Sequence, residues 1–203
     1  MHVAQALQHA QALGLSRIDA QVLLLHTLGQ TTDARAWLLA HDQDLLNDGQ
    51  QQHWQTCLQR RLNGEPVAYI TGEKEFFGLP LQVDARVLDP RPDTETLVTW
   101  ALSLLPDDFD GRVLDLGTGS GAIALALKHA RPQAQVWATD TSVDALAVAR
   151  GNAERHGLPV RFVQADWFAG IDAMPPASGR HEPTQFDLIV SNPPYIADHD
   201  PHL

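Results

Sequence analysis

The segment Asn192-Pro193-Pro194-Tyr195, near the end of the chain, has the residue types of a receptor for an NH₂ group. Proline has no N–H group, so two consecutive prolines end a strand and leave rigid, unpaired carbonyl groups. The Asn192 side chain and the Pro193 carbonyl are two convergent acceptors, which suit an amide or the exocyclic amine of a base. Hydride transfer has no need of such acceptors. The alternative interpretation is a proline-rich turn that binds nothing.

A glycine-rich segment, Asp115 to Gly121 (DLGTGSG), indicates a second binding element. Glycines between a strand and a helix permit a tight turn and let a ligand approach the backbone at the helix N-terminus. Gly117, Gly119 and Ala122 satisfy the relaxed dinucleotide fingerprint, so an NAD-dependent oxidoreductase is one interpretation. The carboxylate of Asp115 favours S-adenosyl-L-methionine instead. It can bind the ammonium group of that ligand, directly or through water, whereas it would repel the negative charge of a pyrophosphate.

Acidic and aromatic residues follow the next two apolar runs. Asp140 can accept hydrogen bonds from both ribose hydroxyls, although it could instead cap the helix that begins after Thr141-Ser142. Asp166 can meet an adenine amino group, and Trp167 can form an aromatic wall beside the base. A tryptophan in the hydrophobic core is the alternative for Trp167.

These motifs must be positioned by alternating strands and helices. The pattern predicts strands at 113–116, 136–139, 160–163 and 186–191, helices at 122–130 and 143–156, and a loop at 170–185. Such alternation predicts a parallel, doubly wound α/β sheet with right-handed crossovers. The motifs then meet in the crevice outside the carboxyl ends of the strands, where open α/β sheets bind ligands.

Two further regions precede this sheet. Residues 1–63 have helical periodicity and predict a small bundle of four short helices, an interaction or substrate-positioning domain. Residues 64–92 predict a linker made of a β-hairpin, which turns near Gly78, and a stiff loop. Pro92 suits the first turn of a helix, so the cofactor-binding domain is expected to span 93–203.

Composition narrows the possible partners. The formal net charge is −11, from 14 Lys+Arg and 25 Asp+Glu, and no basic cluster exceeds Arg60-Arg61, which argues against direct nucleic-acid binding. No apolar run approaches the roughly 20 residues of a membrane helix, and the start does not resemble a signal peptide. A single cysteine agrees with a reducing cytoplasm, the predicted location. Cys57 is expected to pack in a helix, and the ten histidines show no metal-ligand spacing, so no metal site is predicted.

With these residues in place, the chain resembles the HemK/PrmC family over its whole length. Four segments occur in the family's order after an N-terminal helical domain: GEPVAYITGEKEFFGLPLQV, LDPRPDTETLV, VLDLGTGSGAIALAL and SNPPYI. The N-P-P-Y motif alone is shared with amine-directed DNA and RNA methyltransferases, whereas the R-P-D-T-E loop at Arg91–Glu95 is much more specific. The resemblance implies a Rossmann-like methyltransferase that acts on a glutamine side-chain amide in peptide-chain release factors, in translation termination.

The resemblance also assigns roles to residues. It implies that S-adenosyl-L-methionine, which leaves as S-adenosyl-L-homocysteine, is bound by the glycine-rich segment, Asp140, Trp167 and Asn192. Together with the acids at strand ends, the predicted cofactor site comprises Asp115, Gly117, Thr118, Gly119, Ser120, Gly121, Asp140, Asp166, Trp167 and Asn192. The glutamine would be held by Asn192, Pro193, Pro194 and Tyr195. Positioning of the amide nitrogen for in-line transfer is the expected source of catalysis, and no dedicated base is evident.

The sequence also permits other substrates and another class of function. The substrate could be a glutamine of a ribosomal protein or, against the acidic charge, an exocyclic base amine. The helical domain could make the chain a binding module only. The family's methyltransferase domain continues beyond the N-P-P-Y loop, so C-terminal strands are expected to be missing from a chain that ends at Leu203. No membrane partner is predicted, and no oligomeric state.

Overall fold

The computed structural model describes residues 1–169 and 185–193, which form two compact units. The first unit spans Met1–Glu73 and the second Lys74–Leu203. The units divide inside the segment 64–92 that the sequence suggested as a linker, because part of that segment packs into each hydrophobic core. No helix in the described part of the chain is long and apolar enough to span a bilayer.

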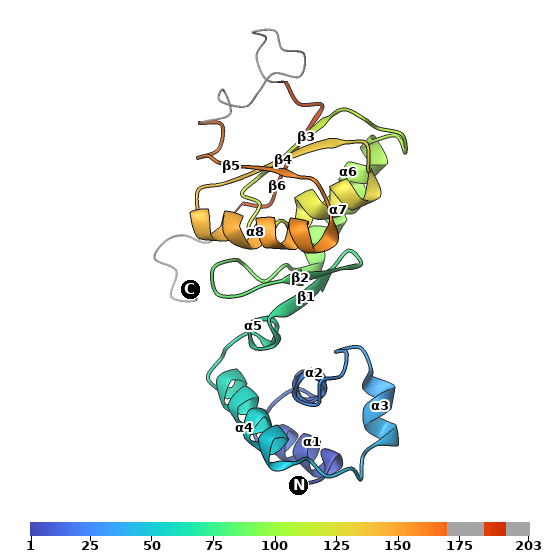
Figure 1. The fold of residues 1–203 in the computed structure, drawn as a ribbon, viewed down its shortest axis with the longest axis vertical. Helices are drawn as coiled ribbons and strands as arrows, with labels where there is room; N and C mark the ends of the chain where they lie inside the picture. The colour runs from blue at the N-terminus through green and yellow to red at the C-terminus, as the bar shows by residue number, and fades with distance from the viewer. Residues whose placement is uncertain (170–184, 194–203) are drawn as a thin grey trace. The chain divides into compact units, whose positions relative to one another are not determined.

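The first unit is helical. Its helices are α1 (Val3–Ala12), α2 (Arg17–Thr27), α3 (Arg35–Ala40), α4 (Asp48–Leu62) and α5 (Val67–Thr71) (Figure 1). The Ser16 hydroxyl caps α2 by accepting a hydrogen bond from the Asp19 N–H, as its position predicts. The sequence pattern missed α5, a five-residue helix that begins after Pro66. Its Ile70 packs into the core formed by α2 and α4, which explains why so short a segment is helical.

The second unit begins with the predicted hairpin, β1 (Glu73–Phe76) and β2 (Leu79–Gln82). Phe77 and Gly78 connect the strands with positive φ angles of 51° and 81°, the conformation of a tight hairpin turn. The side chain of Asn152 joins the edge of β2 to helix α8 (Val143–His156), accepting the Gln82 N–H at 2.7 Å and donating to the Gln82 carbonyl at 3.0 Å. The hairpin is therefore part of the second unit rather than a free linker.

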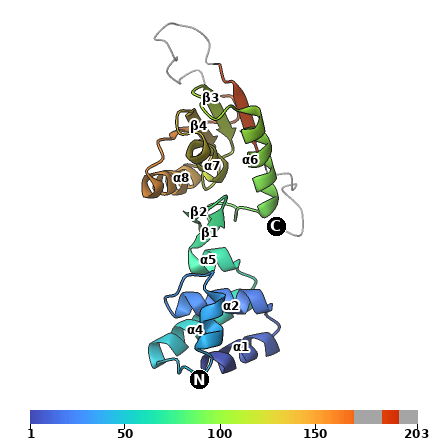
Figure 2. The same ribbon diagram turned by 90° about the vertical axis from the view of Figure 1, so that its right-hand side faces the viewer.

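The central sheet contains β3 (Arg112–Leu116), β4 (Gln135–Asp140), β5 (Arg161–Gln164) and β6 (Leu188–Ser191). Its order is β5-β4-β3-β6, and all described pairs are parallel, which confirms the predicted parallel arrangement. Helices on both faces, which a doubly wound sheet also requires, stay a prediction. In the register, Leu116 lies beside Thr139 on one side and Ser191 on the other, so the strands end together. Their carboxyl ends therefore form one edge of the sheet. Figure 2 shows β3 and β4 of this sheet beside helix α7.

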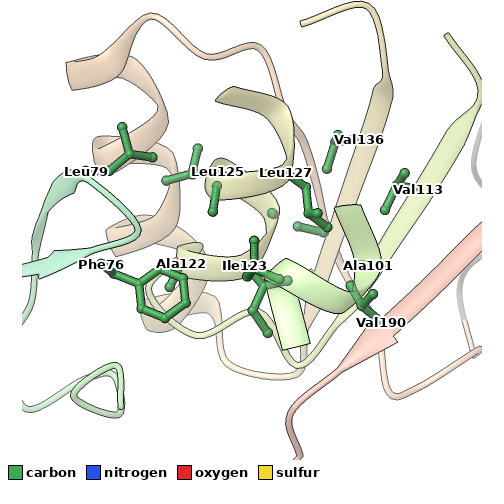
Figure 3. Packing of buried hydrophobic residues seen from close by; sticks show 14 of the residues in the cluster. Phe76, Leu79, Ala101, Val113, Ala122, Ile123, Leu125, Leu127, Val136 and Val190 are labelled. Carbon is green, nitrogen blue, oxygen red and sulfur yellow. The ribbon is translucent and has the colours of Figure 1, made fainter. Parts of the chain in front are cut away.

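Side chains alternate between the two faces of the sheet, as the pleat requires. Val113, Val136 and Val190 face a core to which α6 (Pro92–Leu104), α7 (Ala122–Ala130) and α8 contribute (Figure 3). Leu114 and Trp137 point to the opposite face and form a second cluster. The helices that pack on one face thus fix the strand ends from which the candidate site is built.

Candidate functional site

A cavity of about 430 Å³ lies at the carboxyl edge of the sheet, within the usual range of ligand pockets. The loops that follow all four strands contribute to its wall, together with a loop and helix start that precede the sheet. Its lining includes Gly117, Thr118, Gly119, Ser120, Asp140, Asp166, Trp167, Asn192 and Pro193, and also Arg86, Leu88, Pro90, Arg91 and Thr94. The structure therefore brings most of the predicted site residues together.

The glycine-rich loop forms one wall through its backbone. Gly117 and Gly119 have φ angles of 70° and 55°, a conformation that favours glycine. A Cβ atom at either position would meet no atom within 4 Å, so side chains there would extend into open space where the loop borders the cavity. Gly121 has another role, since its Cβ would lie 3.2 Å from that of Ala149 on α8. The loop can thus admit a ligand on one side while it packs closely on the other.

Asp140 braces this loop at the end of β4. Its Oδ2 accepts the Gly119 N–H at 2.9 Å, and its Oδ1 accepts the Ser142 N–H at 2.9 Å. The cap of α8 is the Ser142 hydroxyl, which accepts the Ala145 N–H, so Asp140 is not the capping residue. Each carboxylate oxygen keeps a lone pair beyond these contacts. Asp140 is therefore a rigid acceptor on the cavity wall, with the chemistry that ribose hydroxyls need.

Asp115 lies beneath the loop and is fully buried. Its Oδ2 accepts a hydrogen bond from the Thr118 hydroxyl at 2.6 Å, while its Oδ1 has no hydrogen-bond partner in the described part of the chain. Burial raises the pKa of Asp115 to about 7, and the Thr118 hydrogen bond opposes this shift only in part. Asp115 and Gly121 are the two predicted cofactor residues that do not line the cavity. Contact between Asp115 and an ammonium group stays a prediction.

Asp166 and Trp167 lie after the end of β5. Trp167 is 54% exposed and lines the cavity, so the interpretation as a core tryptophan is wrong. Its φ angle of 52° is unusual for a bulky residue and turns the chain directly after Asp166, whose carbonyl accepts the Ala169 N–H at 2.9 Å. The turn holds a carboxylate and an indole side by side at the cavity, where both can contact an adenine ring.

Asn192 and Pro193 lie at the end of β6, which the Ser191 hydroxyl ties to β3 through a 2.9 Å hydrogen bond to the Leu116 carbonyl. The Asn192 amide nitrogen donates to the Thr94 hydroxyl at 3.1 Å. This contact leaves Asn192 Oδ1 without a partner among the described residues. The side chain is therefore oriented as an acceptor at the cavity. Pro194 and Tyr195 lie outside the described residues.

The loop at Arg86–Thr94 also lines the cavity, although its sequence, which leads into the distinctive R-P-D-T-E segment, predicted only a stiff loop. Glu95 accepts the Phe77 N–H at 3.1 Å and so fixes the start of α6 to the hairpin. This anchoring places Thr94 against Asn192. Arg91 is exposed at the cavity, and within residues 1–169 and 185–193 its guanidinium has no ion-pair partner. Its charge suits a ligand carboxylate.

The donor and acceptor set of the cavity fits S-adenosyl-L-methionine. Fixed carboxylates, an exposed indole, an open backbone cradle and the Arg91 guanidinium match a ribose diol, an adenine ring and an amino-acid group. Asp140 would suit a dinucleotide equally well, because the acid at this strand end contacts the ribose there too. Asn192 Oδ1 is an acceptor that hydride transfer does not need, and it disfavours the dinucleotide interpretation.

Comparisons with known proteins agree with this geometry. Residues 93–203 match the model of the methyltransferase small domain, and residues 1–72 match the PrmC N-terminal domain. A release factor glutamine methyltransferase of Bordetella pertussis is 50% identical over 94% of this chain and 66% of its own length. The one of Escherichia coli is 43% identical over 98% of this chain and 67% of its own length. The chain thus spans about two thirds of the length of these relatives.

Solved structures align less completely. TrmN from Thermus thermophilus is 32% identical, with a TM-score of 0.39, over 49% of this chain and 27% of its own. The family matches, by contrast, extend over both units of the chain. The chain belongs to the family of release factor glutamine methyltransferases, which are S-adenosylmethionine-dependent enzymes with a Rossmann-like fold.

Proposed function

We propose that this protein transfers a methyl group from S-adenosyl-L-methionine to the side-chain amide nitrogen of a glutamine in a peptide-chain release factor. The observation that carries the proposal is the orientation of Asn192. Its NH₂ group is engaged by Thr94, so its carbonyl is the part available to a substrate amide at the cavity. The names of the curated relatives supply the identity of the substrate.

The cofactor would occupy the cavity between the glycine-rich loop and Trp167. Gly117 and Gly119 leave room for it at the backbone, and Asp140 accepts hydrogen bonds from its ribose. Asp166 and Trp167 contact the adenine, and Arg91 is the available partner for the carboxylate group. S-adenosyl-L-methionine supplies a methyl group that is activated by a sulfonium centre.

The substrate amide would be held at the end of β6. An amide nitrogen is a poor nucleophile because its lone pair is delocalised into the carbonyl group. Asn192 Oδ1 and the Pro193 carbonyl accept hydrogen bonds from the two N–H groups and aim the nitrogen, so the rate gain comes from positioning and from acceptors that stabilise developing positive charge. As the N–C bond forms, the C–S bond breaks, S-adenosyl-L-homocysteine leaves, and one N–H proton passes to water. Pro194 and Tyr195 complete this loop in our proposal, with the Tyr195 ring against the glutamine side chain.

The test follows labelled methyl groups from the cofactor to purified acceptors. Full-length protein is incubated separately with release factor, ribosomal protein and DNA, and label is expected on a glutamine of the release factor. Label on DNA alone, or on ribosomal protein alone, would contradict the proposal. In the same assay Asn192→Ala should lose about 100-fold or more of the activity, by comparison with loss of one charge-stabilising group in other enzymes.

A substrate that acts in translation is consistent with a cytoplasmic location and with a protein partner rather than nucleic acid. The net charge of −11 supports the same choice of partner.

A further inference from the structure

Two helices of the first unit bring together three side chains that can ligate a metal. They are His26 on α2 and His53 and Cys57 on α4. One ligand atom from each lies within 4.8 Å of the other two. None of the three contributes to the methyltransferase cavity. The cluster is therefore a separate feature that the proposed function does not use.

Helix geometry explains how the cluster forms. His53 and Cys57 are four residues apart on α4, so their side chains lie on the same face of that helix. Helix α2 packs against α4. The His26 and His53 rings meet edge to face, with centroids 5.3 Å apart and an interplanar angle of 63°. Cys57 is only 2% exposed, whereas His53 is exposed, so the cluster has one buried end and one end open to solvent.

The surrounding charges permit a cation at this place. Arg60, one turn beyond Cys57 on α4, is a positive group that acts on both His26 and Cys57. Its guanidinium is bound by the Glu65 carboxylate, with an Nε–Oε2 distance of 2.6 Å, so its charge is largely balanced.

We propose that His26, His53 and Cys57 bind one Zn²⁺ ion, with water as the fourth ligand. Two imidazoles and a thiolate are the ligand types that Zn²⁺ prefers, and binding releases the thiol proton. In a tetrahedral site such ligand atoms would be about 3.3–3.6 Å apart, from standard Zn–N and Zn–S distances. The three ligand atoms now lie within 4.8 Å of one another, so binding would draw them together by roughly 1 Å. The ion would join α2 to α4 across the core of the helical unit.

The alternative is a purely structural role, in which Cys57 packs in the core and the two histidine rings pack as an aromatic pair. The two interpretations differ in a measurable way. Calorimetric titration of the metal-free protein with Zn²⁺ should give one site per chain, and Zn²⁺ should raise the Tm of the protein. Co²⁺ used as a spectroscopic probe should give a thiolate-to-metal charge-transfer band, which requires the Cys57 sulfur.

Matched variants decide the outcome. His53→Ala removes an exposed ligand and leaves the core intact, so it should weaken Zn²⁺ affinity at least tenfold and abolish the Tm shift. Cys57→Ser should remove the charge-transfer band. His9→Ala, at an exposed histidine on α1 of the same unit, should leave both signals unchanged. The proposal is overturned if no stoichiometric Zn²⁺ binding is measured, or if His53→Ala and Cys57→Ser bind Zn²⁺ as the original protein does.

Discussion

Replacing Thr94 by valine tests whether the acceptor orientation of Asn192 matters for methyl transfer. Valine has nearly the shape of threonine and lacks only the hydroxyl that receives the Asn192 N–H at 3.1 Å. Without this partner, the side-chain amide can rotate by half a turn. It would then present an NH₂ group, a donor, where the substrate amide needs an acceptor.

The size of the effect follows from one neutral hydrogen bond. Such a bond has a net value of about 0.5–1.5 kcal/mol, which corresponds to about a 2- to 13-fold loss of rate. Loss of the acceptor itself in Asn192→Ala is expected to cost about 100-fold or more. Thr94→Val should therefore be clearly impaired but far more active than Asn192→Ala, with unchanged affinity for the cofactor.

The assay is the initial rate of methyl transfer to release factor by full-length protein, with cofactor affinity measured by calorimetry. Thr94→Ser keeps the hydroxyl and should restore the rate. Thr99→Val is a matched control, because Thr99 is exposed on the same helix and its hydroxyl bonds only to the Glu95 carbonyl, at 2.9 Å. Because Thr94 is expected to act through Asn192, adding Thr94→Val to Asn192→Ala should cause no further loss.

Two results would refute this reasoning. One is a Thr94→Val protein with the rate of the original protein. The other is an equal fold-loss from Thr94→Val in the presence and absence of Asn192, which would mean that the hydroxyl acts independently of that amide.

Three further outcomes are expected. Because the folded-state pKa of Asp115, about 7, exceeds its ordinary value of 3.8, the stabilisation from its bound proton is complete below about pH 4 and is lost as pH rises through 7. Between pH 5 and 8 the free energy of unfolding should therefore fall by about 2–3 kcal/mol in the original protein. Denaturant unfolding of Asp115→Asn should show no fall of that size, and a pH profile equal to that of the original protein would contradict the assignment. Trp167→Ala should weaken cofactor binding by about 1–3 kcal/mol in calorimetry, because the indole would no longer stack on the adenine. Trp100→Ala, at a 64% exposed tryptophan outside the cavity, should leave binding unchanged, and equal effects of the two variants would argue against stacking. Asn152→Leu leaves three backbone groups without this partner, of which the Ser120 carbonyl is buried, and should lower the free energy of unfolding by about 1–3 kcal/mol. A denaturation midpoint equal to that of the original protein would contradict this expectation.

Much of the second unit is predictable because its signals are local. The helices Ala122–Ala130 and Val143–His156 begin and end where the sequence pattern places them, since a glycine or serine precedes each and apolar periodicity fills each. The strands agree to within two residues at the described ends. Parallel strands end at one edge, so the convergence of Gly119, Asp140 and Asn192 follows from topology alone.

Other features could not be read from the chain because they depend on contacts between distant residues. The Thr94–Asn192 hydrogen bond joins positions 98 residues apart. Helix α5 is too short for its periodicity to be recognised, and it is stabilised by the core against which Ile70 packs. The histidine–cysteine cluster combines two helices, so its spacing in sequence resembles no metal motif. The burial that shifts the pKa of Asp115 is likewise a property of the folded sheet.

The amide of Asn152 links two parts of the second unit that are remote in sequence. Besides its two bonds to Gln82 on the hairpin, it donates to the Ser120 carbonyl of the glycine-rich loop at 2.9 Å. The Gln82 N–H is held by this side chain at the edge of β2. Exchange of the Gln82 amide hydrogen with deuterium therefore depends on the Asn152 side chain, which also binds the glycine-rich loop. Any ligand that stabilises the glycine-rich loop should slow this exchange. One backbone amide on the hairpin thus becomes a remote reporter of occupancy at the cavity.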